Sequence, residues 1–345
     1  MEPRQSSPAS PLLEVSGLGI ELDTHRGPAR AVRDVGFSLA QGETLGLIGE
    51  SGSGKSLTAM ALMGLLPQGA RTQGSVRLAG QELLTLSDAQ MCRIRGQRIG
   101  MIFQEPMTAL NPVHTIGAQV AEPLRLHKGL SARHAREAAL ELLHRVGIPQ
   151  PAQRIDAYPH QFSGGQRQRI TIAMALACQP DLLIADEPTT ALDVTVQQQI
   201  LDLIADLVDE RGMSLILISH DLGVISQNVD RMLVMYGGMV VESGSTEQVF
   251  QHMAHPYTRG LLAARPHMAS AGGAHKARLS TIAGTVPELA DLPEGCPFAG
   301  RCGFTADPCW SERPAAREPQ AGHRVRCLRE EAMAAAPPGL AGAQA

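Results

Sequence analysis

Residues 49–56 read Gly49-Glu50-Ser51-Gly52-Ser53-Gly54-Lys55-Ser56, which fills every fixed position of the phosphate-loop pattern GxxxxGK[ST]. An apolar run, Thr44 to Ile48, precedes this loop, and a helix-like run, residues 57–66, follows it. Glycines let successive backbone N–H groups turn inward, and the following helix adds the positive end of its dipole. The stretch therefore predicts a strand–loop–helix phosphate site, with Lys55 reaching the phosphates and the Ser56 hydroxyl on Mg²⁺.

Other runs predict the rest of an α/β fold. Residues 182–185 and 214–219 are apolar without alternation, which is typical of parallel strands buried on both faces. Amphipathic, helix-favouring stretches cover 131–146 and 197–208. Gly237-Gly238 separates two short apolar runs, as in a hairpin turn. Patchier runs resemble antiparallel strands at an edge: 12–15, 35–39 and 75–78. We expect a P-loop domain with an antiparallel β subdomain, a helical subdomain and a cysteine-containing C-terminal extension.

Polar side chains follow the predicted parallel strands. Asp186 and Glu187 end one run, and His220 follows the next. Because the carboxyl ends of parallel strands form the usual ligand edge of an α/β sheet, these side chains are expected to meet the phosphate loop. Asp186 would hold the Mg²⁺ shell through water, and Glu187 would polarise an attacking water as a general base.

A second glycine-rich element lies between the loop and the acidic strand, and it reads Phe162-Ser163-Gly164-Gly165-Gln166-Arg167-Gln168-Arg169. It offers another anion-binding helix start with glycines of its own. One nucleotide needs only one phosphate loop, so the residues alone do not say what this second element binds.

This order of motifs resembles the ATP-binding subunits of ABC transporters, whose signature reads Ser-Gly-Gly-Gln. The resemblance implies that this element caps the γ-phosphate of an ATP held by the opposite subunit, so that ATP joins two such domains and hydrolysis lets them part. It also matches Asp193 to the D-loop, His220 to the switch histidine and Gln104 to the Q-loop glutamine, whose loop couples to the membrane subunit. The implied catalytic residues are Glu187, His220 and Gln104, and the implied Mg²⁺ ligands are Ser56, Gln104 and Asp186. The implied ATP-binding residues are Gly49, Glu50, Ser51, Gly52, Ser53, Gly54, Lys55, Ser56, Leu57, Ser163, Gly164, Gly165, Gln166 and Asp193.

The adenine-stacking position departs from the family. Its members usually offer an aromatic side chain near the N-terminus, but that position falls near Leu22 here. Two alternatives remain for the base: His25 as a substitute, or packing against aliphatic groups only.

Three longer stretches, 49–58, 103–112 and 255–262, resemble the dipeptide/oligopeptide (and nickel) importers, and more narrowly their D-type ATPase subunit. The resemblance covers about residues 12–330 and implies ATP hydrolysis coupled to uptake of di- and oligopeptides across the inner membrane. Its implied partners are a homologous F-type ATPase subunit or a second copy, two transmembrane permeases and an extracytoplasmic solute-binding protein. A nickel or glutathione importer, or a non-transport ABC ATPase acting on a soluble partner, is the alternative. Nothing in the chain would contact the solute.

Charge and sequence pattern exclude several other classes of protein. A net charge of −4 over 345 residues argues against nucleic-acid binding, which favours a basic face. No apolar run approaches the ~18 residues of a membrane span, and the N-terminus lacks a signal-like stretch. Without long heptads between loop and signature, the chain is unlike chromosome-structure ATPases. We expect a peripheral protein on the cytoplasmic face of the inner membrane, held there by partners.

Four of the six cysteines fall in the C-terminal part: Cys296, Cys302, Cys309 and Cys327. Their gaps are wider than the paired spacing of zinc sites, whereas Cys₄ ligation is standard for a [4Fe–4S] cluster. The family's C-terminal domain carries this pattern, and a cluster has been associated with some members. The alternatives are zinc, free thiols or disulfides. ATP binding is expected to be independent of these cysteines, because the phosphate loop lies in a different part of the chain.

The expected organisation has four parts. Residues 1–11 are a disordered tail, and 12–250 form the ATP-binding domain with a helical subdomain at about 90–175. Residues 251–331 form the C-terminal domain of oligopeptide-transporter type. Residues 332–345, rich in Ala, Pro and Gly, form a second disordered tail.

Overall fold

The computed structural model of the chain describes residues 11–190, 192–264 and 282–334. Most of the two tails expected to be disordered, 1–10 and 335–345, therefore lies outside the described residues. Residues 332–334, expected in the second tail, instead belong to a short helix, α13 (Glu330–Ala334). None of the helices in these ranges combines the length and apolar character that crossing a bilayer requires.

An eight-stranded sheet forms the centre of the fold, in the order β11-β12-β10-β9-β3-β8-β7-β6. Its five parallel strands are β3 (Thr44–Ile48), β6 (Ile99–Ile102), β7 (Leu182–Asp186), β8 (Ser214–Ser219) and β9 (Arg231–Tyr236). The remaining three are antiparallel: β10 (Met239–Ser245), β12 (His323–Val325) and β11 (Arg317–Gln320). The three predicted parallel strands and the Gly237-Gly238 hairpin are thus confirmed.

The parallel strands are buried on both faces because two cores cover them. In β7, Leu182 and Ile184 point into one core, whereas Leu183 and Ala185 point into the other. Successive side chains of a strand alternate between faces, so a strand between two cores needs apolar residues throughout. This explains why the strand sequences lack polar alternation.

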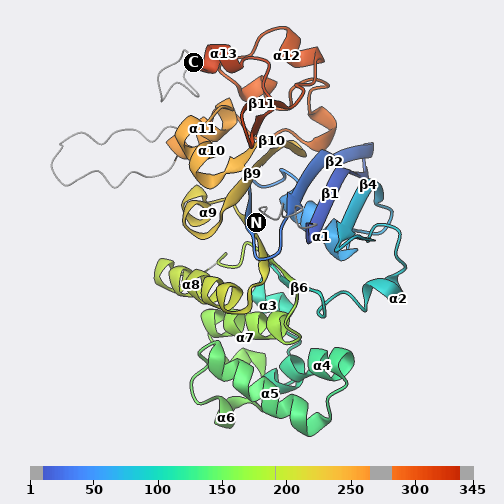
Figure 1. Cartoon of the computed structure of the whole chain (residues 1–345), viewed down its shortest axis with the longest axis vertical. Helices are drawn as coiled ribbons and strands as arrows, with labels where there is room; N and C mark the ends of the chain where they lie inside the picture. The colour runs from blue at the N-terminus through green and yellow to red at the C-terminus, as the bar shows by residue number, and fades with distance from the viewer. Residues whose placement is uncertain (1–10, 191, 265–281, 335–345) are drawn as a thin grey trace, which may run out of the picture.

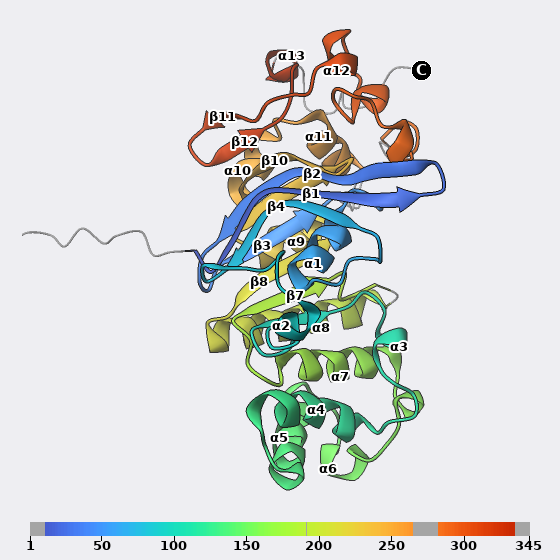
Figure 2. The same ribbon diagram turned by 90° about the vertical axis from the view of Figure 1, so that its right-hand side faces the viewer.

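A separate four-stranded antiparallel sheet, in the order β2-β1-β4-β5, covers one face together with the first helix (Figure 2). The strands are β1 (Leu13–Thr24), β2 (Gly27–Leu39), β4 (Arg71–Leu78) and β5 (Gln81–Glu82), and the helix is α1 (Lys55–Met63). The antiparallel strands expected at an edge are therefore parts of a second sheet, and two of them extend well beyond the predicted runs. Their mixed pattern follows from packing only one face against the core.

Helices cover the other face, and a helical region projects at the end of the molecule opposite the C-terminal extension (Figure 1). Within the span expected to be helical, residues 99–102 instead form β6, so the helices of this region begin after that strand. Ser131 caps one of them, since its side chain accepts the N–H of His134. The helices of the region are α3 (Pro106–Ala109), α4 (Ile116–Lys128), α5 (Ala132–Arg145), α6 (Pro151–Arg154), η1 (Pro159–Gln161) and α7 (Gly164–Leu176). The other helices outside the extension are α2 (Asp88–Met91), α8 (Val194–Arg211), α9 (Leu222–Asn228), α10 (Thr246–His252) and α11 (Pro256–Ala263).

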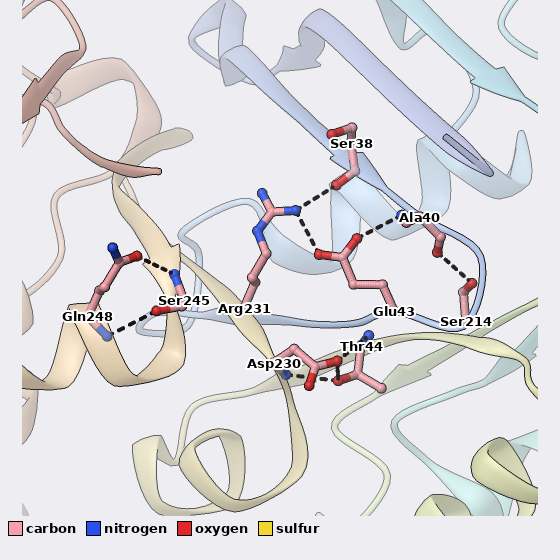
Figure 3. Close-up of polar contacts among 9 residues, drawn as sticks. All are labelled: Ser38, Ala40, Glu43, Thr44, Ser214, Asp230, Arg231, Ser245 and Gln248. Carbon is pink, nitrogen blue, oxygen red and sulfur yellow. Dashed lines mark hydrogen bonds and ion pairs between the residues drawn. The ribbon is translucent and has the colours of Figure 1, made fainter. Parts of the chain in front are cut away.

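Side chains brace the end of the sheet away from the phosphate loop (Figure 3). Asp230 Oδ2 accepts hydrogen bonds from Thr44 N (3.1 Å) and Thr44 Oγ1 (2.7 Å). Glu43 accepts one from Arg231 at 2.7 Å, and Ser214 Oγ donates to the carbonyl of Ala40 at 2.9 Å. These contacts fix where β3, β8 and β9 begin, and hence where their carboxyl ends stop.

The C-terminal extension, residues 282–334, continues the central sheet rather than standing apart from it. Strand β12 pairs with β10, with Val325 opposite Glu242. Phe298 packs edge-on against Tyr236 at 5.0 Å between ring centroids, and Tyr257 lies 4.7 Å from Tyr236. Its helical turns are η2 (Leu289–Asp291), η3 (Ala299–Arg301), α12 (Pro308–Ser311) and α13.

Candidate nucleotide site

The phosphate loop joins β3 to α1 as the sequence predicts. Gly52 and Gly54 adopt φ angles of 80° and 101°, which a residue with a Cβ rarely adopts. The first N–H groups of α1 have no partner within the helix, so they are free to bind an anion. Lys55 is buried and donates to the carbonyls of Gly49 (2.8 Å) and Glu50 (3.0 Å).

Ser56 and Asp186 form a hard-oxygen pair beside this loop. The Ser56 hydroxyl donates to Asp186 Oδ1 at 3.1 Å. Burial raises the pKa of Asp186, which is opposed by the Ser56 hydrogen bond and reinforced by the charge of Glu187. The raised pKa reflects the cost of burying a carboxylate, and a hydroxyl next to a carboxylate is a suitable donor set for Mg²⁺.

Glu187 gathers three polar side chains around one oxygen. Its Oε2 lies 3.1 Å from Gln104 Nε2, 3.1 Å from Thr190 Oγ1 and 3.2 Å from His220 Nδ1. Its backbone has φ 46°, in the left-handed region that costs energy for a residue other than glycine. Hydrogen bonding of its N–H to the Ile218 carbonyl at 3.0 Å holds it there. The structure thus brings together Glu187, Gln104 and His220 from the ends of three strands.

A cavity of about 230 Å³ lies at the mouth of the loop. Its walls are Ala31, residues 51–57, Gln104, Glu187 and Leu289. Gly49, Glu50 and Asp186 do not line the cavity, but they accept hydrogen bonds from its wall residues Lys55 and Ser56. The cavity therefore contains most of the predicted phosphate-binding residues.

The second glycine-rich element stands apart from this cavity. Ser163 caps α7, accepting the N–H of Gln166, and Gln166 in turn accepts the N–H of Ser163. Ser163, Gly164 and Asp193 are exposed, and none of residues 163–166 lines the cavity. Asp193 caps α8, with its side chain accepting the N–H of Val196. Within one chain, these residues face solvent.

A second cavity, of about 410 Å³, adjoins the first and shares Ser51, Gly52 and Leu289 with it. Its walls combine the β1–β2 hairpin, residues 24–26, with residues 286–290 of the extension. Arg26 ties the two walls together, because its two terminal nitrogens each lie 2.8 Å from a carboxylate oxygen of Asp291. Leu22, the position aligned with the family's aromatic, is not among the lining residues, whereas His25 is.

The extension also contacts the phosphate loop directly, a connection that the sequence analysis missed. The buried Arg301 binds the Glu50 carboxylate through two nitrogens, at 2.7 and 3.1 Å. The hydroxyl of Tyr257 accepts the N–H of Glu50 at 2.7 Å. Arg301 and Glu50 are separated by 251 positions, so no local pattern could have paired them. Tyr257 lies in the importer-like stretch 255–262, but nothing in that stretch indicates that it contacts Glu50.

The four cysteines of the extension lie near one another and are free thiols. Burial raises the pKa of Cys296 to about 12, with smaller contributions from its neighbours Cys302, Cys327 and Cys309. Among the described residues, however, no group of three or more His, Cys, Asp or Glu side chains is arranged to hold a metal ion. The expected cluster is thus not supported by this geometry.

Comparison with known families gives two matches. Residues 32–190 match the model described as "ABC transporter". Residues 241–309 match the model described as "Oligopeptide/dipeptide transporter, C-terminal region". The second match begins in β10, two residues after the strand starts, in keeping with an extension that continues the sheet.

Curated relatives match over nearly the whole chain. A protein of Brucella abortus named as a peptide import ATP-binding protein is 54% identical over 306 residues, covering 88% of this chain and 91% of the relative. One of Brucella melitensis with the same description is 49% identical over 334 residues, covering 94% and 99%.

Solved structures show the same architecture in their ATP-binding part. A dimeric ATP-binding cassette in a post-hydrolysis state bound to ADP and Pi has a TM-score of 0.61 and 28% identity, covering 68% of this chain and 98% of that one. A subunit from Clostridium perfringens that is part of an ABC transporter complex has a TM-score of 0.59 and 25% identity, covering 70% and 92%. The predicted α/β fold is confirmed.

Proposed function

This chain belongs to the ABC transporter family as an ATP-binding subunit that hydrolyses ATP, and from that premise we propose that its hydrolysis drives import of di- and oligopeptides. The observation that carries the peptide assignment is the match of residues 241–309 to the oligopeptide/dipeptide transporter region. The names of the Brucella relatives agree with it. No comparable feature favours nickel, glutathione or a soluble partner.

The loop and its neighbours have separate tasks in this proposal. The N–H groups of residues 51–57 and the Lys55 ammonium bind the β- and γ-phosphates. Ser56, Asp186 and Gln104 are the residues that would hold Mg²⁺. When bound, Mg²⁺ neutralises charge on the phosphate oxygens and offsets the cost of the buried Asp186 carboxylate.

Glu187 is the general base for the attacking water. Its Oε2 already accepts hydrogen bonds from Gln104 and Thr190, so the carboxylate is held in one orientation before substrate arrives. His220 lies on the same oxygen and would contact the γ-phosphate as the switch histidine. The strained φ of Glu187 is the kind of outlier that persists where a site requires it.

The exposed start of α7 completes a site in a second ATP-binding subunit. Ser163 to Gln166 are free to cap a γ-phosphate that the partner's loop holds, and Asp193 lies at the same exposed surface. The similar cassette of known structure is dimeric and holds ADP and Pi. ATP then joins two subunits, and its hydrolysis lets them part.

The adenine base occupies the larger cavity, between His25 and the extension. Val286 and Leu289 offer apolar contact, and the shared wall of Ser51, Gly52 and Leu289 connects this cavity to the phosphate cavity. Of the two alternatives for adenine, we therefore favour His25 as the substitute for the family's aromatic, with aliphatic side chains beside it.

We further propose that the four thiols bind a metal centre, with a [4Fe–4S] cluster as first candidate. Supporting this, the Cys302 and Cys327 sulfurs accept backbone N–H groups of Phe304 (3.4 Å) and Arg329 (3.3 Å), and Cys296 accepts that of Phe298. Such N–H···S bonds stabilise thiolates in metal sites. Burial raises these thiol pKa values, so metal binding would release protons. Since no metal-holding group is arranged among the described residues, binding would also require the sulfurs to move closer together.

The partners follow from the family. The proposed assembly contains a homologous F-type ATPase subunit or a second copy, two permeases and an extracytoplasmic solute-binding protein, with this chain on the cytoplasmic face of the membrane. Residues 12–250 act as the ATP-binding unit and 251–331 as the C-terminal domain of oligopeptide-transporter type, of which the extension is the later part. The exposed Gln104 loop is the proposed contact with the permeases.

The role of Glu187 as general base is tested by Glu187→Gln. Removing it while keeping the shape should slow hydrolysis roughly 10²–10⁴-fold and leave ATP bound. The variant should accumulate as an ATP-bound dimer, seen by size-exclusion chromatography with ATP. Glu137→Gln, on the exposed face of α5, is the control and should turn over normally. Near-normal turnover of Glu187→Gln would remove Glu187 from this role.

The composite site is tested by Ser163→Arg and Gly164→Asp. Each should abolish ATPase activity of the assembled dimer, because a bulky or anionic side chain blocks the partner's γ-phosphate, while the isolated chain still binds ATP. Ser131→Arg alters the corresponding cap of α5 and should leave activity intact. Loss of ATP binding by the isolated Ser163→Arg chain would mean that this element acts within its own subunit.

The proposed adenine cavity is tested by Leu289→Ser. Lost apolar contact of about 1.5 kcal/mol should raise the Kd for ATP roughly tenfold. Binding of tripolyphosphate, which has no base, should not change. Leu126→Ser, at an exposed position of α4, serves as control. Unchanged ATP affinity in Leu289→Ser would place the base elsewhere.

The metal centre is tested by analysing anaerobically purified protein. One [4Fe–4S] unit requires about four irons per chain, and Cys302→Ser should lose them while Cys92→Ser and Cys178→Ser keep them. One zinc per chain would replace the cluster by a zinc site. Metal-free protein in which all four cysteines of the extension titrate as thiols would contradict both.

A further inference from the structure

Arg301 places all five of its N–H donors on acceptors around the phosphate loop. Two bonds reach the Glu50 carboxylate at 2.7 and 3.1 Å, and one reaches the Tyr236 hydroxyl at 3.2 Å. The other two reach the carbonyls of Ala283 (2.8 Å) and Gly284 (3.3 Å). A guanidinium has five donors in a rigid planar fork, so this one is fully satisfied in a single orientation.

In the Arg301–Glu50 ion pair, the arginine side chain is buried and the glutamate side chain is partly exposed. The Arg301 side chain is 6% exposed and that of Glu50 is 29% exposed. Burial alone would lower the pKa of Arg301, but its hydrogen bonds to Glu50 and Tyr236 more than offset this and raise it. A charge held this way is costly to leave unpaired, so the extension and the loop are bound to each other.

Glu50 is held at every polar group. Its N–H binds Tyr257, its carboxylate binds Arg301, and its carbonyl accepts both Lys55 Nζ (3.0 Å) and the N–H of Ser53 (3.2 Å). A shift of Glu50 would therefore move the loop and the lysine that meet the phosphates. Tyr236 and Phe298 pack beside the guanidinium and leave it little room to follow.

From this geometry we infer that Arg301 of the C-terminal extension is a positioning residue for ATP binding, which acts by fixing Glu50 and thereby the phosphate loop. The inference rests on the proposed function. It concerns Arg301 and not the adjacent Cys302, so the expectation that ATP binding is independent of the four cysteines stays a prediction.

Two carboxylates allow a matched comparison. Glu50 and Asp34 both belong to the ATP-binding part and both pair with an arginine of the extension, Asp34 with Arg326 at 2.8 Å. Only Glu50 lies in the phosphate loop. Asp34 has φ 52°, a conformation that asparagine tolerates, so Asp34→Asn removes the charge without backbone strain.

The experiment measures ATP affinity, KM, kcat and the melting temperature without nucleotide for the full chain. Glu50→Gln should raise the Kd and KM for ATP roughly 10- to 100-fold, the effect of a displaced binding loop, with a smaller change in kcat. Asp34→Asn should bind ATP like the wild type. The double variant Glu50→Gln/Arg301→Gln should be no weaker than the weaker single variant, because both changes break one pair.

Two results would overturn the inference about Arg301. Wild-type affinity in Glu50→Gln, with or without a lower melting temperature, would overturn the inference and leave the pair a purely structural contact. Additive losses in the double variant would also overturn it. If Arg301→Gln cannot be recovered folded, Glu50→Gln alone decides, since it leaves the extension's own residues unchanged. A wild-type chain that bound no ATP would instead contradict the proposed function.

Discussion

The bidentate contact between Arg301 and Glu50 is the constraint on which the nucleotide site depends. A phosphate loop binds well only if its N–H groups are already aimed at the phosphates, since ordering them on binding would consume affinity. Here β3 fixes one end of the loop, α1 the other, and the extension holds the residue between them. The extension is therefore part of the nucleotide site as well as a neighbour of it.

The residues proposed for hydrolysis and the start of α7 differ in whether one chain is sufficient to complete their site. Glu187, Gln104 and His220 meet at one oxygen, so the proposed hydrolytic residues are assembled within one chain. Ser163 and Gly164 are exposed and away from the cavity, so one chain alone leaves that helix start without a ligand. A nucleotide bound between two such chains would satisfy both halves. Binding and release then become closing and opening of a dimer, the motion that a transporter can use.

The sequence was sufficient wherever the signal was local. The runs 44–48 and 214–219 gave the strands with correct bounds, because strands between two cores must be apolar throughout. The phosphate loop, Glu187 at the end of a predicted strand and Gln104 from the family resemblance account for most of the cavity wall. The antiparallel strands were underestimated, because β1 and β2 bury only one face and alternate with polar residues. Nothing local could pair Arg301 with Glu50, or bring Leu289 to the cavity mouth. Such contacts depend on how the extension folds back onto the ATP-binding part, and no local sequence pattern predicts that.

A structure of the full chain with Mg²⁺ and a non-hydrolysable ATP analogue would test the central claim most directly. The account predicts two chains that share two analogues, each with its phosphates on Lys55 of one chain and Ser163 of the other. The base should lie between His25 and Leu289, and Arg301 should remain on Glu50. Phosphates bound away from Lys55, or an Arg301–Glu50 contact that opens when the analogue binds, would contradict it.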